Sequence, residues 1–128
     1  MIRWPTSGTE PPEDALPIMR LTWAHRASPE TLKPNERRAA VVWANFFNVC
    51  TNISTKYVLD SWKVGTILTG HEGYSPHRQT VSQVMELVAE LGKEHVKLRP
   101  VEDRNALVID RSDFDAYVED LPAEVAPL

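Results

Sequence analysis

The chain has 128 residues, of which 42% are hydrophobic and 25% are charged, which is enough for one globular domain with its own core. Its longest uninterrupted apolar run, residues 39–44, is far shorter than the roughly 20 residues that a membrane-spanning helix needs. No signal-type hydrophobic stretch follows Met1, so we expect a cytoplasmic protein without a membrane partner. Cys50 is the only cysteine, which excludes internal disulfides and cysteine-clustered zinc sites, and its apolar neighbours predict a buried structural thiol.

The net charge of −4 is unevenly distributed along the chain. Residues 1–16 carry −2, residues 17–100 carry +4 and residues 101–128 carry −6. The basic middle permits contact with nucleic acid without requiring it. The acidic end is by default the solvated side of a last helix.

The first 34 residues are predicted to form a proline-rich arm outside the folded domain. Six of the ten prolines fall in this segment, and proline blocks helix continuation because it lacks a backbone N–H. Residues 18–23 form an apolar cluster without a helix cap, which predicts a short strand or an extended strip laid over the core. Trp4 and Trp23 are candidate anchors, packed either on their own domain or on a partner.

Two helices are expected after the arm. Asn35 can cap the first, whose apolar positions from Ala39 to Cys50 form one broad face. Ser54 can cap the second, which would carry Tyr57, Val58 and Trp62; Gly65 is a candidate for its end, because glycine costs about 1 kcal/mol inside a helix. Residues 71–79 contain glycine and proline without periodicity, which predicts a loop.

The segment from Thr80 to Glu119 gives the clearest pattern. Thr80 and Gln83 have the spacing of a capping box, apolar residues at helical spacing follow, and Gly92 ends the helix. Residues 96–99 and 106–109 are predicted to be the strands of a β-hairpin with a five-residue polar tip, and Ser112 can cap a short final helix.

Helices followed by a hairpin are the layout of a winged helix-turn-helix. The predicted fold is therefore α+β and of that type, with three helices, a β-hairpin wing and a short C-terminal helix in residues 35–122. Residues 123–128 are expected to be a tail.

The sequence offers little for catalysis or metal binding. It has no glycine-rich phosphate loop and no nucleophile elbow. His71, Glu72 and His77 lack the spacing that places two imidazoles on one helical face. Carboxylates from Asp110 to Asp115 are explained by a helix start. We therefore expect no enzyme activity, no metal and no cofactor.

The third predicted helix and the hairpin carry groups suited to double-stranded DNA. In a winged helix the third helix presents its N-terminal half to the major groove, while the wing contacts the flanking backbone. Glu86 and Glu90 on the exposed face would repel phosphate, so the helix must enter by its N-terminus. The alternative is a solvated helix face that contacts nothing. The predicted contacts are Arg78, Gln79, Thr80, Ser82, Gln83, Lys97, Arg99 and Arg104.

Residues 107–117, which read Leu-Val-Ile-Asp-Arg-Ser-Asp-Phe-Asp-Ala-Tyr, resemble the ending of phage excisionase and MerR-like small winged-helix DNA-binding proteins. In that family a wing strand runs into Arg-Ser-Asp, a hydrophobe, Asp and an aromatic residue. The resemblance implies that Arg104 and Arg111 touch the DNA backbone while the preceding helix reads the groove.

The predicted function is that of a non-catalytic, sequence-selective DNA-binding regulator or recombination accessory factor. The alternative is a protein-interaction module on the same scaffold, in which the acidic C-terminal region and the tryptophans of the arm bind another protein. The DNA site and the oligomeric state stay open, with a dimer among the options.

Overall fold

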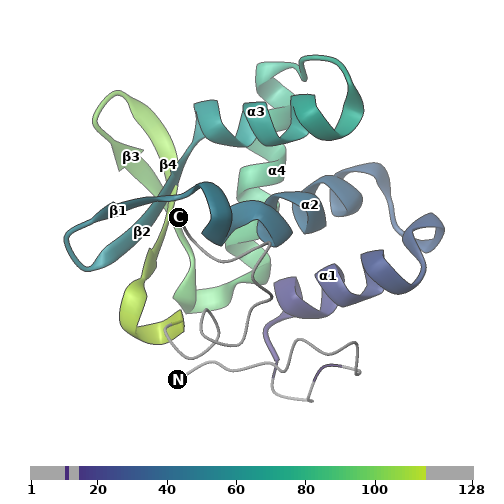
Figure 1. Cartoon of the computed structure of the whole chain (residues 1–128), viewed down its shortest axis with the longest axis horizontal. Helices are drawn as coiled ribbons and strands as arrows, with labels where there is room; N and C mark the ends of the chain where they lie inside the picture. Colours follow the sequence, from purple (N-terminus) through teal and green to yellow (C-terminus); the bar gives the residue numbers. More distant parts are fainter. Residues whose placement is uncertain (1–10, 12–14, 115–128) are drawn as a thin grey trace.

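The computed structural model describes residue 11 and residues 15–114, which form an α+β fold with a four-stranded antiparallel sheet (Figure 1). Among these residues, no helix is both long enough and apolar enough to cross a membrane. The helices are α1 (Pro17–Ala27), α2 (Pro34–Val49), α3 (Ser61–Glu72) and α4 (Arg78–Leu91), with 3-10 turns at Pro29–Thr31 and Lys93–His95. The strands are β1 (Thr51–Ile53), β2 (Lys56–Asp60), β3 (Lys97–Val101) and β4 (Arg104–Asp110).

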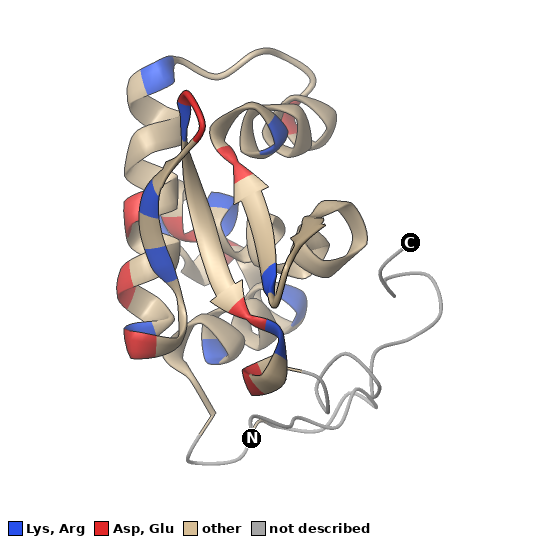
Figure 2. Ribbon diagram, turned by 90° about the vertical axis from the view of Figure 1, so that its left-hand side faces the viewer, with Lys and Arg blue, Asp and Glu red and all other residues tan. Residues whose placement is uncertain are grey.

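The sheet combines two hairpins in the order β1-β2-β4-β3. Its inner face contributes Tyr57, Leu59 and Leu107 to the main core with the helices, which lie behind the sheet in Figure 2. A second, smaller group of buried residues forms from side chains that alternate with these. We call it the outer cluster, and it consists of Val58, Ala106 and Val108.

The segment predicted to be extended, residues 18–23, is instead part of helix α1. Ile18 and Met19 are fully buried in the main core, and the Thr22 hydroxyl donates to the Ile18 carbonyl at 2.8 Å. Trp23 is half-buried against the same core. The described part of the predicted arm is therefore integral to the domain, whereas Trp4 lies outside the described residues.

The proline content was misleading because three of these prolines begin helices. Pro17, Pro29 and Pro34 each occupy the first position of a helix or 3-10 turn. At that position the missing N–H is harmless, since the first N–H groups of a helix have no intrahelical acceptor.

Helix α2 also begins earlier than predicted. Pro34 is its first residue, so Asn35 lies inside the helix and the predicted Asn35 cap is wrong. The Glu36 carboxylate instead accepts a hydrogen bond from the Lys33 backbone N–H at 2.8 Å. The broad apolar face itself is confirmed, because Trp43 and Phe46 are at most 1% exposed.

Residues 54–60 were predicted to begin a helix and instead form a hairpin turn and strand β2. Ser54 has a positive φ of 55° in the turn. The strand is buried on both faces, with Tyr57 and Leu59 in the main core and Val58 in the outer cluster. Such a strand reads as a continuous apolar run, which periodicity alone does not distinguish from a buried helix.

Helix α3 consequently starts at Ser61, where the Asp60 carboxylate accepts a hydrogen bond from the Lys63 backbone N–H at 2.9 Å. Gly65 lies inside this helix, so the predicted end there is wrong. The helix ends at Gly73, whose φ of 83° is the left-handed conformation that favours glycine. The predicted loop shortens to residues 73–77.

The predicted helix and hairpin from residue 80 onward exist, but their boundaries differ. Helix α4 begins at Arg78 with His77 at the N-cap and no side-chain cap, so the Thr80 capping box is wrong. Its predicted end at Gly92 is confirmed, and a Cβ there would lie only 2.5 Å from Val96 Cβ. The hairpin turn contains only residues 102 and 103. Residues 111–114 are helical, so Ser112 does not cap that helix.

His25 predicts a loss of stability in acid. It lies in the last turn of α1, and its ring centroid is 6.3 Å from that of His71. Burial is the main cause that lowers the pKa of His25, and the charges of His71 and Arg37 lower it further. The unfolded chain therefore takes up a proton before the folded chain does, and stability falls as pH drops below about 6.5. We expect the thermal midpoint to decrease between about pH 7 and about pH 5, and less steeply in His25→Gln. Parallel curves for the two proteins would contradict this assignment.

Candidate nucleic-acid interface

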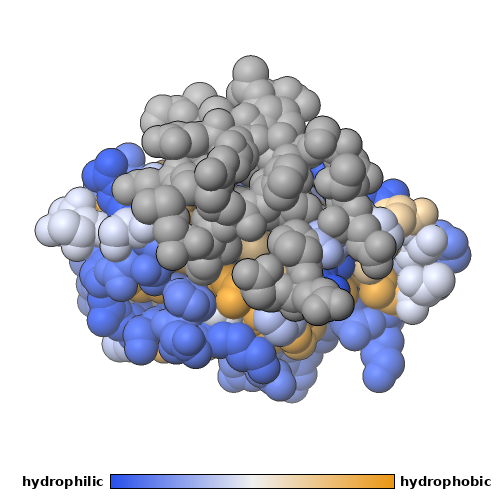
Figure 3. All heavy atoms as spheres, turned by 90° about the horizontal axis from the view of Figure 1, so that it is seen from below, coloured by the Kyte–Doolittle hydropathy of each residue, from blue (hydrophilic) through white to orange (hydrophobic). Residues whose placement is uncertain are grey.

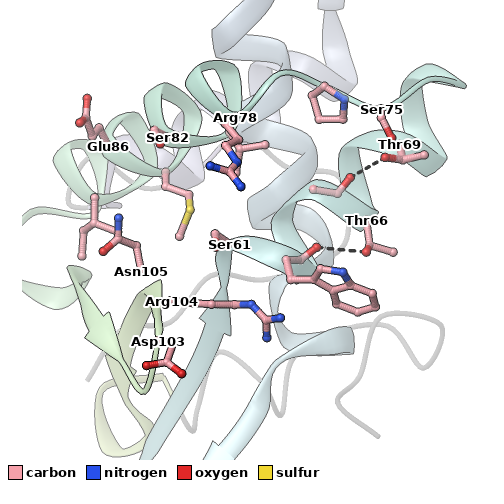
Figure 4. Close-up of a pocket in the computed structure, with 16 residues that line it drawn as sticks. Ser61, Thr66, Thr69, Ser75, Arg78, Ser82, Glu86, Asp103, Arg104 and Asn105 are labelled. Carbon is pink, nitrogen blue, oxygen red and sulfur yellow. Dashed lines mark hydrogen bonds between the residues drawn. The ribbon is translucent and has the colours of Figure 1, made fainter.

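A groove of about 750 Å³ lies between α3, α4 and the tip of the β3–β4 hairpin (Figure 4). Arg78, Ser82 and Glu86 line it from α4, where their spacing of four residues places them on one side of the helix. Arg104 and neighbouring hairpin residues form the facing wall. We call this surface the arginine groove, and its other lining residues include Ser61, Trp62, Thr66, Thr69, Ser75, Asp103 and Asn105.

The two arginines reach this groove from segments far apart in the sequence. Both side chains belong to exposed residues, and Figure 4 shows Arg78 reaching from α4 into the groove and Arg104 reaching from the hairpin tip toward the start of α3. Arg104 Nη1 lies 3.8 Å from Asp60 Oδ2, while the other oxygen of Asp60 caps α3. Asp60 therefore connects the hairpin tip to the start of α3.

The groove contains both signs of charge. Glu86 and Asp103 line it together with Arg78 and Arg104, so its four charged residues compensate one another. The first turn of α4 also lies beside it, and its backbone N–H groups receive no side-chain cap from His77. Such N–H groups and the helix dipole favour a negatively charged group near Arg78.

The remaining predicted DNA contacts lie on other surfaces. Gln83 faces α2, where its Oε1 accepts a hydrogen bond from Asn35 Nδ2 at 3.4 Å. Gln79 is exposed and Thr80 half-buried in the first turn of α4, and neither lines the arginine groove. The structure therefore brings only Arg78, Ser82 and Arg104 together among the predicted contacts.

The cations of strand β3 belong to the outer face of the sheet. Lys97 pairs in register with Val108, and Arg99 with Ala106, so both flank the outer cluster. Arg104 pairs with Val101 on the same face, but at the tip of the hairpin it also lines the arginine groove. On the same face, the Lys56 ammonium donates a hydrogen bond to the Asp110 carboxylate and thereby lowers its pKa.

Arg111 is remote from the groove. It follows the end of β4 opposite to Arg104, and a seven-residue strand is about 23 Å long. Its guanidinium carbon lies 5.6 Å from the ring centroid of Tyr57, and its backbone N–H donates to the Thr55 carbonyl at 2.9 Å. This position anchors the end of β4 against the β1–β2 hairpin.

Sequence reasoning missed Trp62 as a surface residue. The side chain is 63% exposed and lines the arginine groove from the first turn of α3. It had been assigned to the apolar face of a helix starting at Ser54. With the observed start, the buried positions are Val64 and Leu68, and Trp62 is displaced from Val64 by about 200° around the helix axis.

Two of the three residues considered for a metal site, Glu72 and His71, are engaged in other contacts. Glu72 pairs with Arg38 through a 2.6 Å hydrogen bond from Nε, and His71 lies beside His25. Within the described residues, no three His, Cys, Asp or Glu side chains are grouped so as to hold a metal ion. Cys50 is only half-buried, and desolvation raises its pKa to about 11, so its thiol is protonated and weakly nucleophilic at neutral pH.

A second groove of about 570 Å³ lies between α2 and α3. Val41, Val49 and Ile67 give it an apolar lining, and Trp62 lies at its border with the arginine groove. The part of the surface visible in Figure 3 is mainly hydrophilic, with smaller hydrophobic areas. Trp62 is the most exposed of the large hydrophobic side chains that the structure describes.

Comparison with known proteins gives no relative: no family model, curated protein or solved structure matches the chain.

Proposed function

We propose that this protein is a non-catalytic DNA-binding protein of the winged-helix type. In this proposal the N-terminal half of α4 and the tip of the β3–β4 hairpin contact duplex DNA. The observation that carries it is the placement of Arg78 and Arg104 on facing walls of the arginine groove. The biological role would be that of a transcriptional regulator or a recombination accessory factor.

The order of elements supports the winged-helix interpretation. A helix, a strand, two helices and a hairpin follow one another as α2, β2, α3, α4 and β3–β4. The last strand pairs between the other two, in the order β2-β4-β3. In winged helices this arrangement places a recognition helix next to a hairpin wing. Helix α1 and strand β1 are additions to that pattern.

The charges define how DNA would approach. Arginine binds phosphate or guanine through two parallel hydrogen bonds, and Arg78 lies at the start of α4, where the positive end of the helix dipole also attracts an anion. Glu86 and Glu90 follow along the helix and oppose phosphate. DNA is therefore expected at the Arg78 end of α4, with Arg104 contacting the flanking backbone.

A protein-interaction module is the second candidate. The exposed Trp62 and the apolar groove between α2 and α3 favour it, because exposed aromatic residues beside apolar surface are common at protein interfaces. This candidate predicts no appreciable affinity for duplex DNA at physiological salt, since protein contact does not depend on the release of phosphate counterions.

The test is a titration of labelled duplex fragments with the full chain at two salt concentrations. Fluorescence anisotropy measures the binding. Arg78→Ala is expected to weaken binding by about 1–3 kcal/mol and to reduce the salt slope by about 1, because one phosphate or base contact is lost. Arg104→Ala should have a similar effect, and Lys97→Ala a smaller one because Lys97 does not line the arginine groove. Glu86→Gln should leave affinity equal or higher.

Arg26→Ala is the matched control, since it removes the same charge from an exposed residue in the last turn of α1. Its effect should be limited to the small change that net charge produces. Absence of salt-sensitive binding by the wild-type protein would eliminate the DNA-binding proposal. Equal losses in Arg26→Ala and Arg78→Ala would show that binding does not use the arginine groove.

A further inference from the structure

We propose that the arginine groove binds an unpaired DNA nucleotide, with its base stacked on Trp62 and its phosphate held by Arg78 and Arg104. The inference rests on the proposed function and deepens it, because it names the form of DNA that the site prefers. It predicts that single-stranded tails or unpaired bases beside a duplex bind more tightly than fully paired DNA.

The exposure of Trp62 has no structural explanation in the core of α3. Val64 and Leu68 are the fully buried residues of that helix, and both lie in the main core. The Trp62 side chain is 63% exposed at the border of the groove. An indole ring in this setting is a stacking platform, and stacking accepts every base because every base has a π-face.

The polar lining suits a nucleotide. Ser75, Ser82 and Asn105 line the groove, and their side chains form no hydrogen bond within the described part of the chain, so they are available to a ligand. The Thr66 hydroxyl is already used, since it donates to the Trp62 carbonyl at 3.0 Å within α3. Single-strand binding sites combine cations that hold the backbone with aromatic side chains on which bases stack. Arg78, Arg104 and Trp62 supply both, and the carboxylates of Glu86 and Asp103 confine the phosphate to the arginines.

The size of the groove favours an unpaired nucleotide over a duplex as its ligand. A volume of about 750 Å³ is within the range of small-molecule sites, roughly 300–1,000 Å³. A duplex contacts such a surface only at its rim, whereas an unstacked nucleotide can enter it. An apolar peptide is disfavoured, because four charged side chains line the walls and would be desolvated without partners.

The experiment compares three labelled probes by anisotropy with the full chain: a blunt duplex, the same duplex with a short thymidine tail, and a thymidine oligonucleotide. We expect the tail to increase affinity about tenfold, in line with stacking of one base. Trp62→Ala should bring the ratio of tailed-duplex to blunt-duplex affinity, both measured with the same variant, down to about one, and Trp62→Phe should retain most of the gain. Tyr74→Ala is the control, since Tyr74 is 58% exposed but does not line the groove.

Equal affinity for blunt and tailed duplexes would overturn the inference and leave the proposed function standing. So would an equal loss for both probes in Trp62→Ala, or an equal loss of the tail's gain in Tyr74→Ala. If the blunt duplex shows no salt-sensitive binding, the proposed function fails. Binding of the thymidine oligonucleotide then tests the nucleotide site by itself. Binding of that oligonucleotide that Trp62→Ala abolishes would support the nucleotide site, and no binding would overturn it.

Discussion

Replacing Phe46 with alanine is expected to lower the free energy of unfolding by about 3–5 kcal/mol. Phe46 is fully buried, and its ring centroid lies 5.6 Å from that of Trp43 and 5.3 Å from that of Phe47. Truncation removes the apolar area of the ring and leaves a cavity among aromatic neighbours. Because small domains are stable by only about 5–15 kcal/mol, the variant should lose a large share of its stability. Urea denaturation followed by circular dichroism measures the change.

Ala44 offers the matched control on the same helix. It is exposed, so Ala44→Ser should change stability by at most about 0.5 kcal/mol. A loss below about 1 kcal/mol in Phe46→Ala would mean that the aromatic face of α2 does not form the core.

The elements predicted correctly are those whose apolar pattern has a single period. The apolar residues of α2 and α4 recur at helical spacing, because one side of each helix faces the core. In the β3–β4 hairpin, Val96 and Leu98 alternate with exposed Lys97 and Arg99, which is the pattern of a strand with one buried face. The period of the apolar residues therefore predicts a helix or strand correctly when only one face of that element is buried.

The errors arose where tertiary contacts override that pattern. Strand β2 has Tyr57 and Leu59 on one buried face and Val58 on the other, so its sequence has no period of two. Because the helix was predicted to start at Ser54 and not at Ser61, the predicted buried side of the helix differs from the observed one. Trp62 was therefore expected in the core. One wrong boundary thus concealed the exposed aromatic residue that borders the arginine groove.

The candidate site was predictable only in part, for a related reason. The sequence identified Arg78, Ser82 and Arg104 because a helix start and a hairpin are natural places for DNA contacts. Whether those segments face one another depends on long-range packing. The Gln83 side chain is hydrogen-bonded to Asn35, 48 residues away, and so lies outside the groove. No local sequence pattern predicts this contact.

Met19→Ala is expected to cost about 2–5 kcal/mol, and it tests the part of the fold that the sequence concealed. An extended arm lying over the surface would tolerate this change, whereas in α1 Met19 is fully buried in the main core with Ile18. Ala27→Ser is the control, because Ala27 is exposed at the end of the same helix. If thermal and urea denaturation showed both variants as stable as the wild type, α1 would be an appendage after all. A large loss in Met19→Ala alone would establish that α1 is required for the stability of the fold that holds the arginine groove.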